Sequence, residues 1–322
     1  MTPPPSDHFN GKTFFHPRTV GAGRWRALLK WKFSGRSAPW PPAIDVEPPP
    51  PPPAPRGDEI VATWIGHATF LLQTTRGNFL FDPVFSDRAS PVPWAGPRRV
   101  HPPGLALDAL PRIDTVLLSH DHYDHCDAAS LRRLAAAHDP VCLAPLRHRD
   151  LLEAAGARKI FELDWWDTHV LAPEVTVTHT PSQHWSNRFG TPRNHRLWGG
   201  FFLTFGEGAT ARRVWFAGDS GYDADSFRAI GRRCGTPDLA LIPIGAYEPR
   251  WFMAPMHMNP AEAVATHRAV GARRSVAMHW GTFQLTDEAR ETPPEALAAA
   301  RREAGMAEDE FCVLSPGASL VI

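Results

Sequence analysis

The feature that most constrains the fold is the polar segment Ser119-His-Asp-His-Tyr-Asp-His125, which directly follows the apolar run TVLL. Such a run predicts a buried strand, so the polar segment begins where the chain leaves the sheet. His120 and His122 lie two residues apart on this turn, and their imidazoles can therefore reach one cation together. Asp124 and His125 lie further round the turn and are expected to face a second cation. Imidazole and carboxylate ligands without thiolate suit Zn²⁺, with Fe or Mn as alternatives.

Three other apolar runs lead into residue types that bind metals. The runs 175–178, 214–217 and 275–278 lead to His184, Asp219 and His279, respectively. Because ligands of open α/β sheets bind at the carboxyl ends of the strands, these side chains can converge on one edge. His184 then completes a three-histidine set for the first metal, and His279 completes the second site. A carboxylate such as Asp219 can bridge two metals about 3.5–4 Å apart.

Strands and helices alternate along the chain after an opening run of strands. Besides the four runs above, strands are predicted at 60–65, 69–73, 78–81 and 239–243, and helices at 128–138, 260–270 and 292–304. Asn259 is placed to cap the second of these helices, with a proline in its first turn. Gly66 and His67 are expected to form a bulge or turn between the first two strands. This alternation predicts an α/β sandwich.

Residues 1–57 differ in character from the rest of the chain, and we expect the metal-binding domain to occupy residues 58–322. Segment 24–33 (RWRALLKWKF) mixes basic with aromatic and aliphatic side chains, and the six prolines at 48–53 favour an extended spacer. The basic segment is either a short interfacial helix on an anionic bilayer, or a helix that packs on the metal-binding domain or a dimer partner.

The composition disfavours several classes of protein. Lys+Arg and Asp+Glu both number 34, so the formal net charge is zero and a nucleic-acid partner is not expected. The 4 cysteines form no CxxC pair and the amino terminus lacks the pattern of a signal peptide, which predicts reduced thiols in a cytoplasmic protein. No stretch approaches ~18 apolar residues, so we expect no spanning helix, while peripheral contact with the inner membrane surface stays open.

Short motifs surround the candidate ligands. Besides HxHxDH at 120–125, they are 63–69 (TWIGHAT), 81–86 (FDPVFS), 88–91 (RASP), 183–185 (QHW), 197–199 (LWG), 216–222 (FAGDSGY), 249–253 (PRWFM) and 279–283 (HWGTF). The first pattern resembles the leading signature of the metallo-β-lactamase superfamily. The others together resemble its N-acylphosphatidylethanolamine-hydrolysing phospholipase D family, over roughly residues 60–316.

The resemblance implies an αββα four-layer sandwich, two zinc ions, a homodimer and a phosphodiesterase reaction. It assigns one zinc to His120, His122 and His184, the other to Asp124, His125 and His279, and the bridge to Asp219. The implied reaction converts N-acylphosphatidylethanolamine to phosphatidic acid and an N-acylethanolamine. Two zinc ions that share a water can supply hydroxide near neutral pH, and we predict its in-line attack on phosphorus. The predicted catalytic residues are Asp124, Asp219 and His257.

Four further side chains need an interpretation. His257 either polarises the phosphate and assists the leaving oxygen, as the resemblance implies, or is a helix-start residue that contacts backbone. Asp82 either hydrogen-bonds a ligand histidine or starts a turn. Asp127 is expected to cap the helix that follows it. His67 is expected to have a structural role in its turn.

Apolar side chains cluster next to His257 in a segment broken by proline and polar residues, which indicates a loop. They are Trp251, Phe252, Met253, Met256 and Met258. An adaptable, methionine-rich wall would suit the acyl chains of a phospholipid substrate. Zinc-hydroxide chemistry serves C–O and P–O bonds alike, so a lactonase or a sugar-phosphate hydrolase is the alternative enzyme. A non-catalytic metal-binding scaffold is the alternative of another class.

Overall fold

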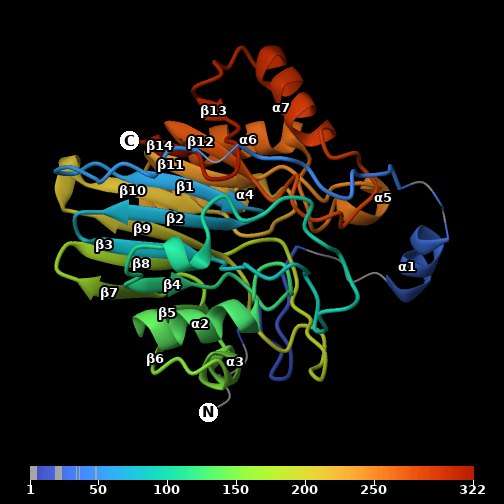
Figure 1. Cartoon of the computed structure of the whole chain (residues 1–322), viewed down its shortest axis with the longest axis horizontal. Coiled ribbons are helices and arrows are strands. Elements are labelled where there is room, and N and C mark those ends of the chain that lie inside the picture. The colour runs from blue at the N-terminus through green and yellow to red at the C-terminus, as the bar shows by residue number, and fades with distance from the viewer. Residues whose placement is uncertain (1–5, 19–23, 34, 36, 48) are drawn as a thin grey trace.

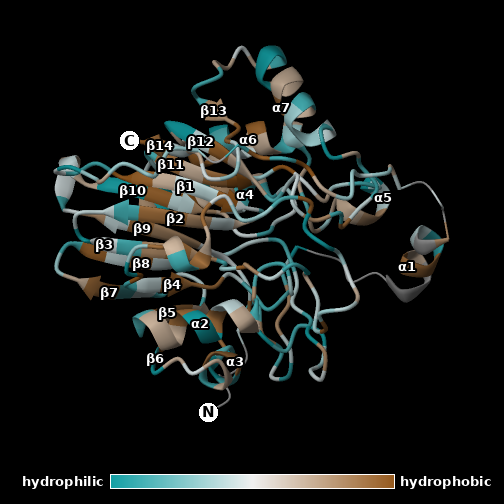
Figure 2. Cartoon of the chain, in the orientation of Figure 1, coloured by the Kyte–Doolittle hydropathy of each residue, from teal (hydrophilic) through white to brown (hydrophobic). Residues whose placement is uncertain are grey.

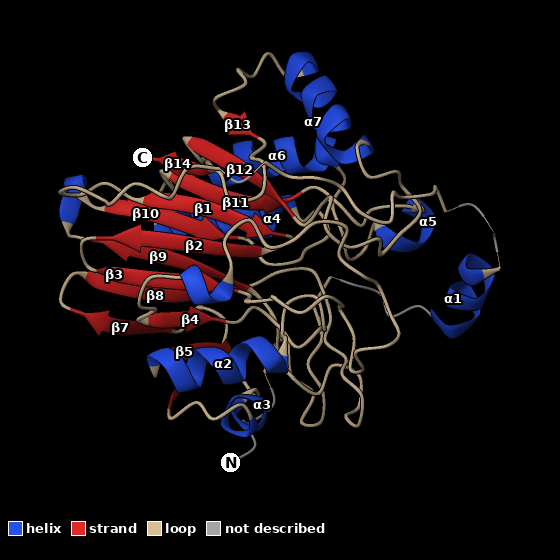
Figure 3. Cartoon of the chain, viewed as in Figure 1, coloured by secondary structure: helices blue, strands red, loops and turns tan. Residues whose placement is uncertain are grey.

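The computed structural model describes residues 6–18, 24–33, 35, 37–47 and 49–322. Part of the interfacial-helix prediction rests on side chains that lie outside this description, namely those of Arg24, Trp25, Arg26 and Lys32. Over the described residues, two seven-stranded sheets lie face to face with helices on their outer faces (Figures 1 and 3). The predicted αββα sandwich is therefore confirmed.

The two sheets bring their parallel strands to a common edge. The first sheet has the order β14-β1-β2-β3-β4-β5-β6, and its strands are β1 (Val61–Gly66), β2 (Thr69–Thr74), β3 (Gly77–Phe81), β4 (Thr115–Leu117), β5 (Val141–Pro145), β6 (Lys159–Leu163) and β14 (Ser319–Val321). The second has the order β13-β12-β11-β10-β9-β8-β7, and its strands are β7 (Thr168–Ala172), β8 (Val175–Thr180), β9 (Gly200–Phe205), β10 (Arg212–Phe216), β11 (Leu239–Pro243), β12 (Arg274–Met278) and β13 (Phe311–Cys312). Strands β3 to β6 are parallel, and so are β10 to β13. Within each sheet, the carboxyl ends of these strands therefore face the same way, and the long loops gather at that end (Figure 1).

Side chains of the first sheet alternate between two cores. On β2, Phe70 and Leu72 belong to the large core between the sheets, whereas Leu71 belongs to the core beneath the outer helices. On β3, Leu80 points outward in the same way as Leu71. Because both faces are covered, the sequences of these strands are largely continuous apolar runs rather than an alternating pattern. Figure 2 shows brown stretches along the strands, mixed with white and teal ones.

Helices cover both sheets, and the three predicted at 128–138, 260–270 and 292–304 begin at the predicted residues. The helices are α1 (Arg24–Lys32), α2 (Ala128–His138), α3 (Arg149–Ala154), α4 (Ala224–Cys234), α5 (Arg250–Met253), α6 (Pro260–Val270) and α7 (Thr292–Glu303). Helices α2 and α3 bury leucines against the first sheet, whereas α4 and α6 bury apolar side chains against the second. Asn259 begins α6 with a capping box shared with Glu262, and Asp127 caps α2, as predicted.

The predicted strands and helices are confirmed to within two residues at each end. Strands β5, β6, β7, β9, β13 and β14 and helices α3, α4 and α5 were not predicted. Strands β13 and β14 span two and three residues, and β7 is partly exposed along its whole length, so they carry little periodicity.

The amino-terminal residues pack on the sandwich. Phe9 and Phe14 are buried in a small core with Trp165 and Trp198. Helix α1 lies beside α5, at the right of Figure 1. The division of the chain at residue 57 stays a prediction. None of the helices in the described part of the chain is long and apolar enough to cross a membrane.

The contact between the sheets can be tested away from the loops. Phe79 of β3 and Phe205 of β9 stack edge to face across the interface, with ring centroids 5.2 Å apart. We expect Phe205→Ala to lower the free energy of unfolding by about 3–5 kcal/mol, because it leaves a cavity between the sheets. Val170→Ala, on the exposed side of β7, is the matched control and should change the free energy of unfolding by about 0.5 kcal/mol or less. Chemical denaturation measures both; equal effects would contradict the assignment of the core.

Candidate metal centre

The seven predicted metal ligands come together at one edge of the sandwich. They follow β4 (His120, His122, Asp124 and His125), β8 (His184), β10 (Asp219) and β12 (His279). Two of the groups that could hold an ion are His120 with His122 and His184, and Asp124 with His125, His279 and His67. The strand-end argument therefore brought the right side chains together; their role as ligands stays a prediction.

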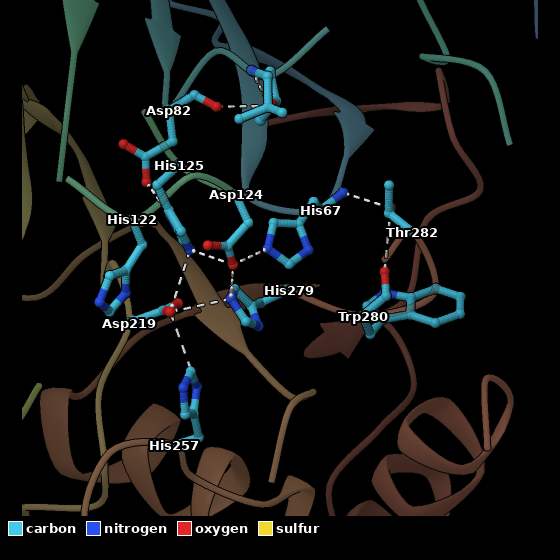
Figure 4. Close-up of polar contacts among 12 residues, drawn as sticks. His67, Asp82, His122, Asp124, His125, Asp219, His257, His279, Trp280 and Thr282 are labelled. Atoms are coloured by element: carbon cyan, nitrogen blue, oxygen red, sulfur yellow. Dashed lines mark hydrogen bonds and ion pairs between the residues drawn. The ribbon is translucent and has the colours of Figure 1, made fainter. Parts of the chain in front are cut away.

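In the second predicted site, one oxygen of each of two carboxylates lies close to the same two imidazole nitrogens (Figure 4). Asp219 Oδ2 lies 3.2 Å from His125 Nε2 and 3.1 Å from His279 Nε2. Asp124 Oδ2 lies 3.5 and 3.4 Å from the same two nitrogens. A tetrahedral zinc ion with bonds of about 2.0–2.2 Å has ligands about 3.3–3.6 Å apart. The spacing of these atoms therefore fits one zinc-sized cation.

In the first predicted site, three imidazoles lie near one another and near the same carboxylate oxygen. His122 Nδ1 lies 2.9 Å from His120 Nε2 and 3.3 Å from His184 Nε2. Asp219 Oδ2 lies 3.6 Å from His184 Nε2 and 4.0 Å from His120 Nε2. One oxygen of Asp219 thus faces both groups of ligands, which is the position of a bridging carboxylate.

The centre holds polar atoms that protein groups do not satisfy. Within the described structure, both carboxylate oxygens of Asp219 and the Nε2 atoms of His125 and His279 are buried without a hydrogen-bond partner. Burying such groups unpaired costs about 1–3 kcal/mol each, so the cluster is incomplete by itself. The donor set and its unpaired atoms fit bound cations.

The charges at the centre also favour cations. Burial lowers the pKa of His279, but Asp219 and Asp124 more than offset this and raise it to about 9. Burial raises the pKa of Asp219, but His125 and His279 reverse this and hold it well below its usual range. The carboxylates thus stabilise positive charge at the nitrogens, whether a proton or a metal ion supplies it.

Asp82 holds two of the predicted ligand histidines through hydrogen bonds. Its Oδ2 accepts hydrogen bonds from His125 Nδ1 and from Ser119 Oγ, both at 2.6 Å, and its Oδ1 accepts from the Ser119 backbone N–H at 2.7 Å. Ser119 Oγ in turn accepts from His120 Nδ1 at 2.9 Å. With Nδ1 protonated, Nε2 of both histidines presents a lone pair to the metal site. Of the two interpretations of Asp82, the structure shows the contact with a histidine, His125, that is a predicted ligand.

Two contacts around the centre were not predicted. His67 Nε2 lies 2.9 Å from Asp124 Oδ2, so this residue does more than form a turn. In the loop after β4, buried Asp121 pairs with buried Arg196 at 3.3 Å, and the Asn187 backbone N–H donates to the same carboxylate. Both contacts join residues far apart in the chain, so no spacing pattern signals them.

His257 lies beside the ligands as the resemblance implied. Its ring lies 5.0 Å from that of His184 and 5.3 Å from that of His279, and its Nδ1 lies 3.9 Å from Asp219 Oδ2. Burial lowers the pKa of His257 to about 4, although Asp219 opposes this. The imidazole is therefore neutral near neutral pH and can both donate and accept a hydrogen bond.

A cavity of about 570 Å³ opens above the two groups of ligands. Phe252, Met253 and Met256 of the predicted apolar wall line it, while Trp251 is 53% exposed beside Phe252. Met258 does not belong to this wall. Its side chain is fully buried in the core between the sheets, so the prediction for Met258 was wrong.

Helix α1 forms part of the same cavity. Leu28 and Trp31 line it, and the Trp31 ring packs on Phe252 with centroids 5.4 Å apart. Lys30 Nζ lies 5.0 Å from the centre of the Trp251 ring. Of the interpretations left open for this segment, the structure shows packing against the metal-binding domain.

Comparison with known proteins agrees with this geometry. Residues 77–280 match the family described as "Beta-lactamase superfamily domain". The chain is 41% identical over 235 residues to "N-acyl-phosphatidylethanolamine-hydrolyzing phospholipase D 1" of Caenorhabditis elegans, which covers 70% of this chain and 65% of that protein. It is 32% identical over 264 residues to a "UPF0173 metal-dependent hydrolase" of Rubrobacter xylanophilus, which covers 80% of this chain and 95% of that protein. The structure of the "metallo-beta-lactamase fold protein YhfI" of Bacillus subtilis matches with a TM-score of 0.54 and 17% identity, covering 82% and 100% of the two chains.

Two mixed sheets between helices, with histidines and carboxylates gathered at one edge, define a metal-dependent hydrolase. The chain belongs to the metallo-β-lactamase superfamily. The resemblance to N-acylphosphatidylethanolamine-hydrolysing phospholipase D is confirmed by the 41% identity, although the alignment spans slightly less than two thirds of that relative.

The role of Asp82 can be measured directly. Asp82→Asn keeps the size of the side chain but removes an acceptor from Ser119 or His125, so we expect zinc affinity to fall about 10–100-fold. Asp127→Asn is the control, because asparagine caps a helix about as well as aspartate. Competition with a chromophoric chelator gives both affinities; an unchanged affinity in Asp82→Asn would show that Asp82 only shapes its turn.

Proposed function

We propose that the chain is a zinc-dependent phosphodiesterase of the phospholipase D type, which hydrolyses N-acylphosphatidylethanolamine to phosphatidic acid and an N-acylethanolamine. The observation that carries the proposal is the cavity, in which the candidate ligands and an apolar wall face the same space. The name of the C. elegans relative supports the choice of substrate. Zinc is the proposed metal because the ligands are imidazole and carboxylate, with iron and manganese as alternatives.

The proposed ligands hold two ions. His120, His122 and His184 would hold one, Asp124, His125 and His279 would hold the other, and Asp219 would be shared by both. When bound, the ions would neutralise charge on the phosphoryl oxygens and lower the pKa of a water to near 7. Asp124 and Asp219 contribute to catalysis by holding this pair in place. Neutral His257, next to Asp219, would donate a hydrogen bond to a phosphoryl oxygen or to the leaving oxygen.

The lining of the cavity suits a lipid. Phe252, Met253 and Met256 offer flexible apolar surface directly beside His257. Among the described residues that line the cavity, Arg193 is the one with a lysine or arginine side chain, and its guanidinium lies 4.1 Å from the centre of the Trp185 ring. An apolar space with little fixed positive charge favours acyl chains over a free sugar phosphate.

The rim of the cavity supports entry from a lipid surface. Phe189 lines the cavity and is 90% exposed, and Trp251 stands beside the wall. Phe33, just after α1, is 84% exposed. Aromatic side chains of this kind bury readily at the surface of a bilayer, and Lys30 adds positive charge beside them. Peripheral contact with an anionic membrane is therefore part of the proposal.

The reaction is tested by identifying products by mass. Zinc-loaded protein is incubated with N-acylphosphatidylethanolamine, phosphatidylcholine or a lactone, and we expect phosphatidic acid and N-acylethanolamine from the first. Asp219→Asn should lower this turnover at least about 100-fold, because it changes the shared ligand itself. Asp225→Asn, on the exposed surface of α4, should leave it unchanged. Ring opening of the lactone alone would favour the alternative enzyme, and absence of turnover with two bound metals would favour a scaffold.

The apolar wall makes a separate prediction. Replacing Trp251 and Phe252 together by serine should slow hydrolysis of the phospholipid at least about 10-fold more than hydrolysis of a short soluble diester, because about 1.5–3 kcal/mol is lost for each apolar side chain removed from contact with an acyl chain. Phe161→Ser, on an exposed face of β6, is the control. Equal losses on both substrates would show that the wall supports the fold rather than the lipid.

A further inference from the structure

The side chain of His67 reaches into the second ligand group from a part of the chain that supplies none of the predicted ligands. It lies on the turn between β1 and β2, and its Nε2 is 2.9 Å from Asp124 Oδ2 (Figure 4). We propose that His67 is a positioning residue of the second metal site, which holds Asp124 Oδ2 in the ligating orientation through an Nε2–H hydrogen bond.

The direction of this hydrogen bond follows from the partners. An ionised carboxylate can only accept, so the proton of the pair lies on His67 Nε2. A carboxylate oxygen has lone pairs for more than one partner, so Asp124 Oδ2 can accept a hydrogen bond from His67 and bind a cation at the same time. It is this same oxygen that lies 3.4–3.5 Å from the Nε2 atoms of His279 and His125.

Asp124 is the ligand of this site that most needs to be held. Its side chain is 14% exposed, whereas those of His125, His279 and Asp219 are 0% exposed. The closely packed ligands have their orientation fixed by their surroundings. A carboxylate at the edge of the cavity can rotate, and a hydrogen bond to one oxygen selects which oxygen faces the metal.

His67 itself is held by contacts from both sheets. Its backbone N–H donates to Thr282 Oγ1 at 2.8 Å, and its carbonyl accepts from Trp64 Nε1 at 2.8 Å and from the His279 backbone N–H at 2.9 Å. His67 has φ 52°, a left-handed conformation that non-glycine residues adopt only when surrounding structure imposes it.

The ring of His67 is packed as firmly as its backbone. It lies 4.0 Å from the ring of His279 and meets Phe283 edge to face at 5.3 Å, in centroid distances. A residue needed only to close a turn would not require an imidazole in this place. The inference rests on the two-metal site of the proposed function, but not on the choice of a phospholipid.

The test measures metal binding rather than turnover. His67→Phe keeps the ring but removes the donor, and His67→Gln keeps a side-chain N–H that can reach Asp124. We expect His67→Phe to bind the second of two zinc ions about 10–100-fold more weakly, with the first unchanged, and His67→Gln to recover most of the loss. In Co²⁺-loaded protein, the absorption band of one of the two sites should change in His67→Phe and return in His67→Gln.

A matched control separates positioning from packing. His267 is also buried, pairs with Ser275 Oγ at 2.8 Å and stacks on Phe311, away from the centre. His267→Phe should change thermal stability but neither zinc affinity. If His67→Phe does not fold, His67→Asn replaces it, because asparagine tolerates a left-handed φ and is too short to reach Asp124.

Several outcomes overturn the inference. Unchanged affinity for the second zinc in His67→Phe or His67→Asn would do so. An equal loss in His67→Gln would also do so, because it would make His67 a direct ligand or a packing residue. Native protein that binds fewer than two zinc ions would contradict both this inference and the proposed function. Native protein that binds two and does not hydrolyse the phospholipid would contradict the proposed function alone.

Discussion

The centre of this molecule is a carboxylate without a hydrogen-bond partner. In the described structure, Asp219 Oδ2 lies within 4.0 Å of imidazole nitrogens from five histidines. These are His120, His125, His184, His257 and His279. An arrangement of this kind is unfavourable unless cations occupy it, because burying polar groups without partners costs free energy. The strands that end at this edge therefore do more than form a core: they hold the predicted ligands together at a cost in free energy that metal binding would offset.

Much of the fold and of this centre could be predicted from the sequence, because both depend on local patterns. A ligand that directly follows an apolar run, as His279 does, is placed by the end of its strand. Asp82 was proposed as a partner of a ligand histidine for the same reason, because it lies at the end of β3. His67 and the pair of Asp121 with Arg196 depend instead on contacts between loops, across 57 and 75 residues of chain. Such contacts are set by how the loops pack, and they leave no periodicity in the sequence.

The apolar wall shows where a local pattern stops being informative. Met256 lines the cavity, whereas Met258, two residues later, is buried in the core. The backbone N–H of Met258 donates to the Ser220 carbonyl at 2.9 Å, and its sulfur lies 3.5 Å from Thr266 Oγ1 of α6, which turns this side chain inward. The composition of the segment does not distinguish Met256 from Met258. The direction of each depends on the backbone of the loop before α6.

Each proposed metal ion is held by both sheets. The loop after β4 would contribute His122 to one proposed site and His125 to the other, while Asp219, which follows β10, would contribute to both. Ions bound there would cross-link the layers at the edge where long loops replace paired strands. Because the unfolded chain lacks this geometry, metal binding would stabilise the folded state by mass action. At high metal concentration, this stabilisation grows with the logarithm of the ratio of the free metal concentration to the dissociation constant. The same ligands would then provide the reactive centre and the connection between the layers, so a change that loosens one sheet edge affects both stability and chemistry.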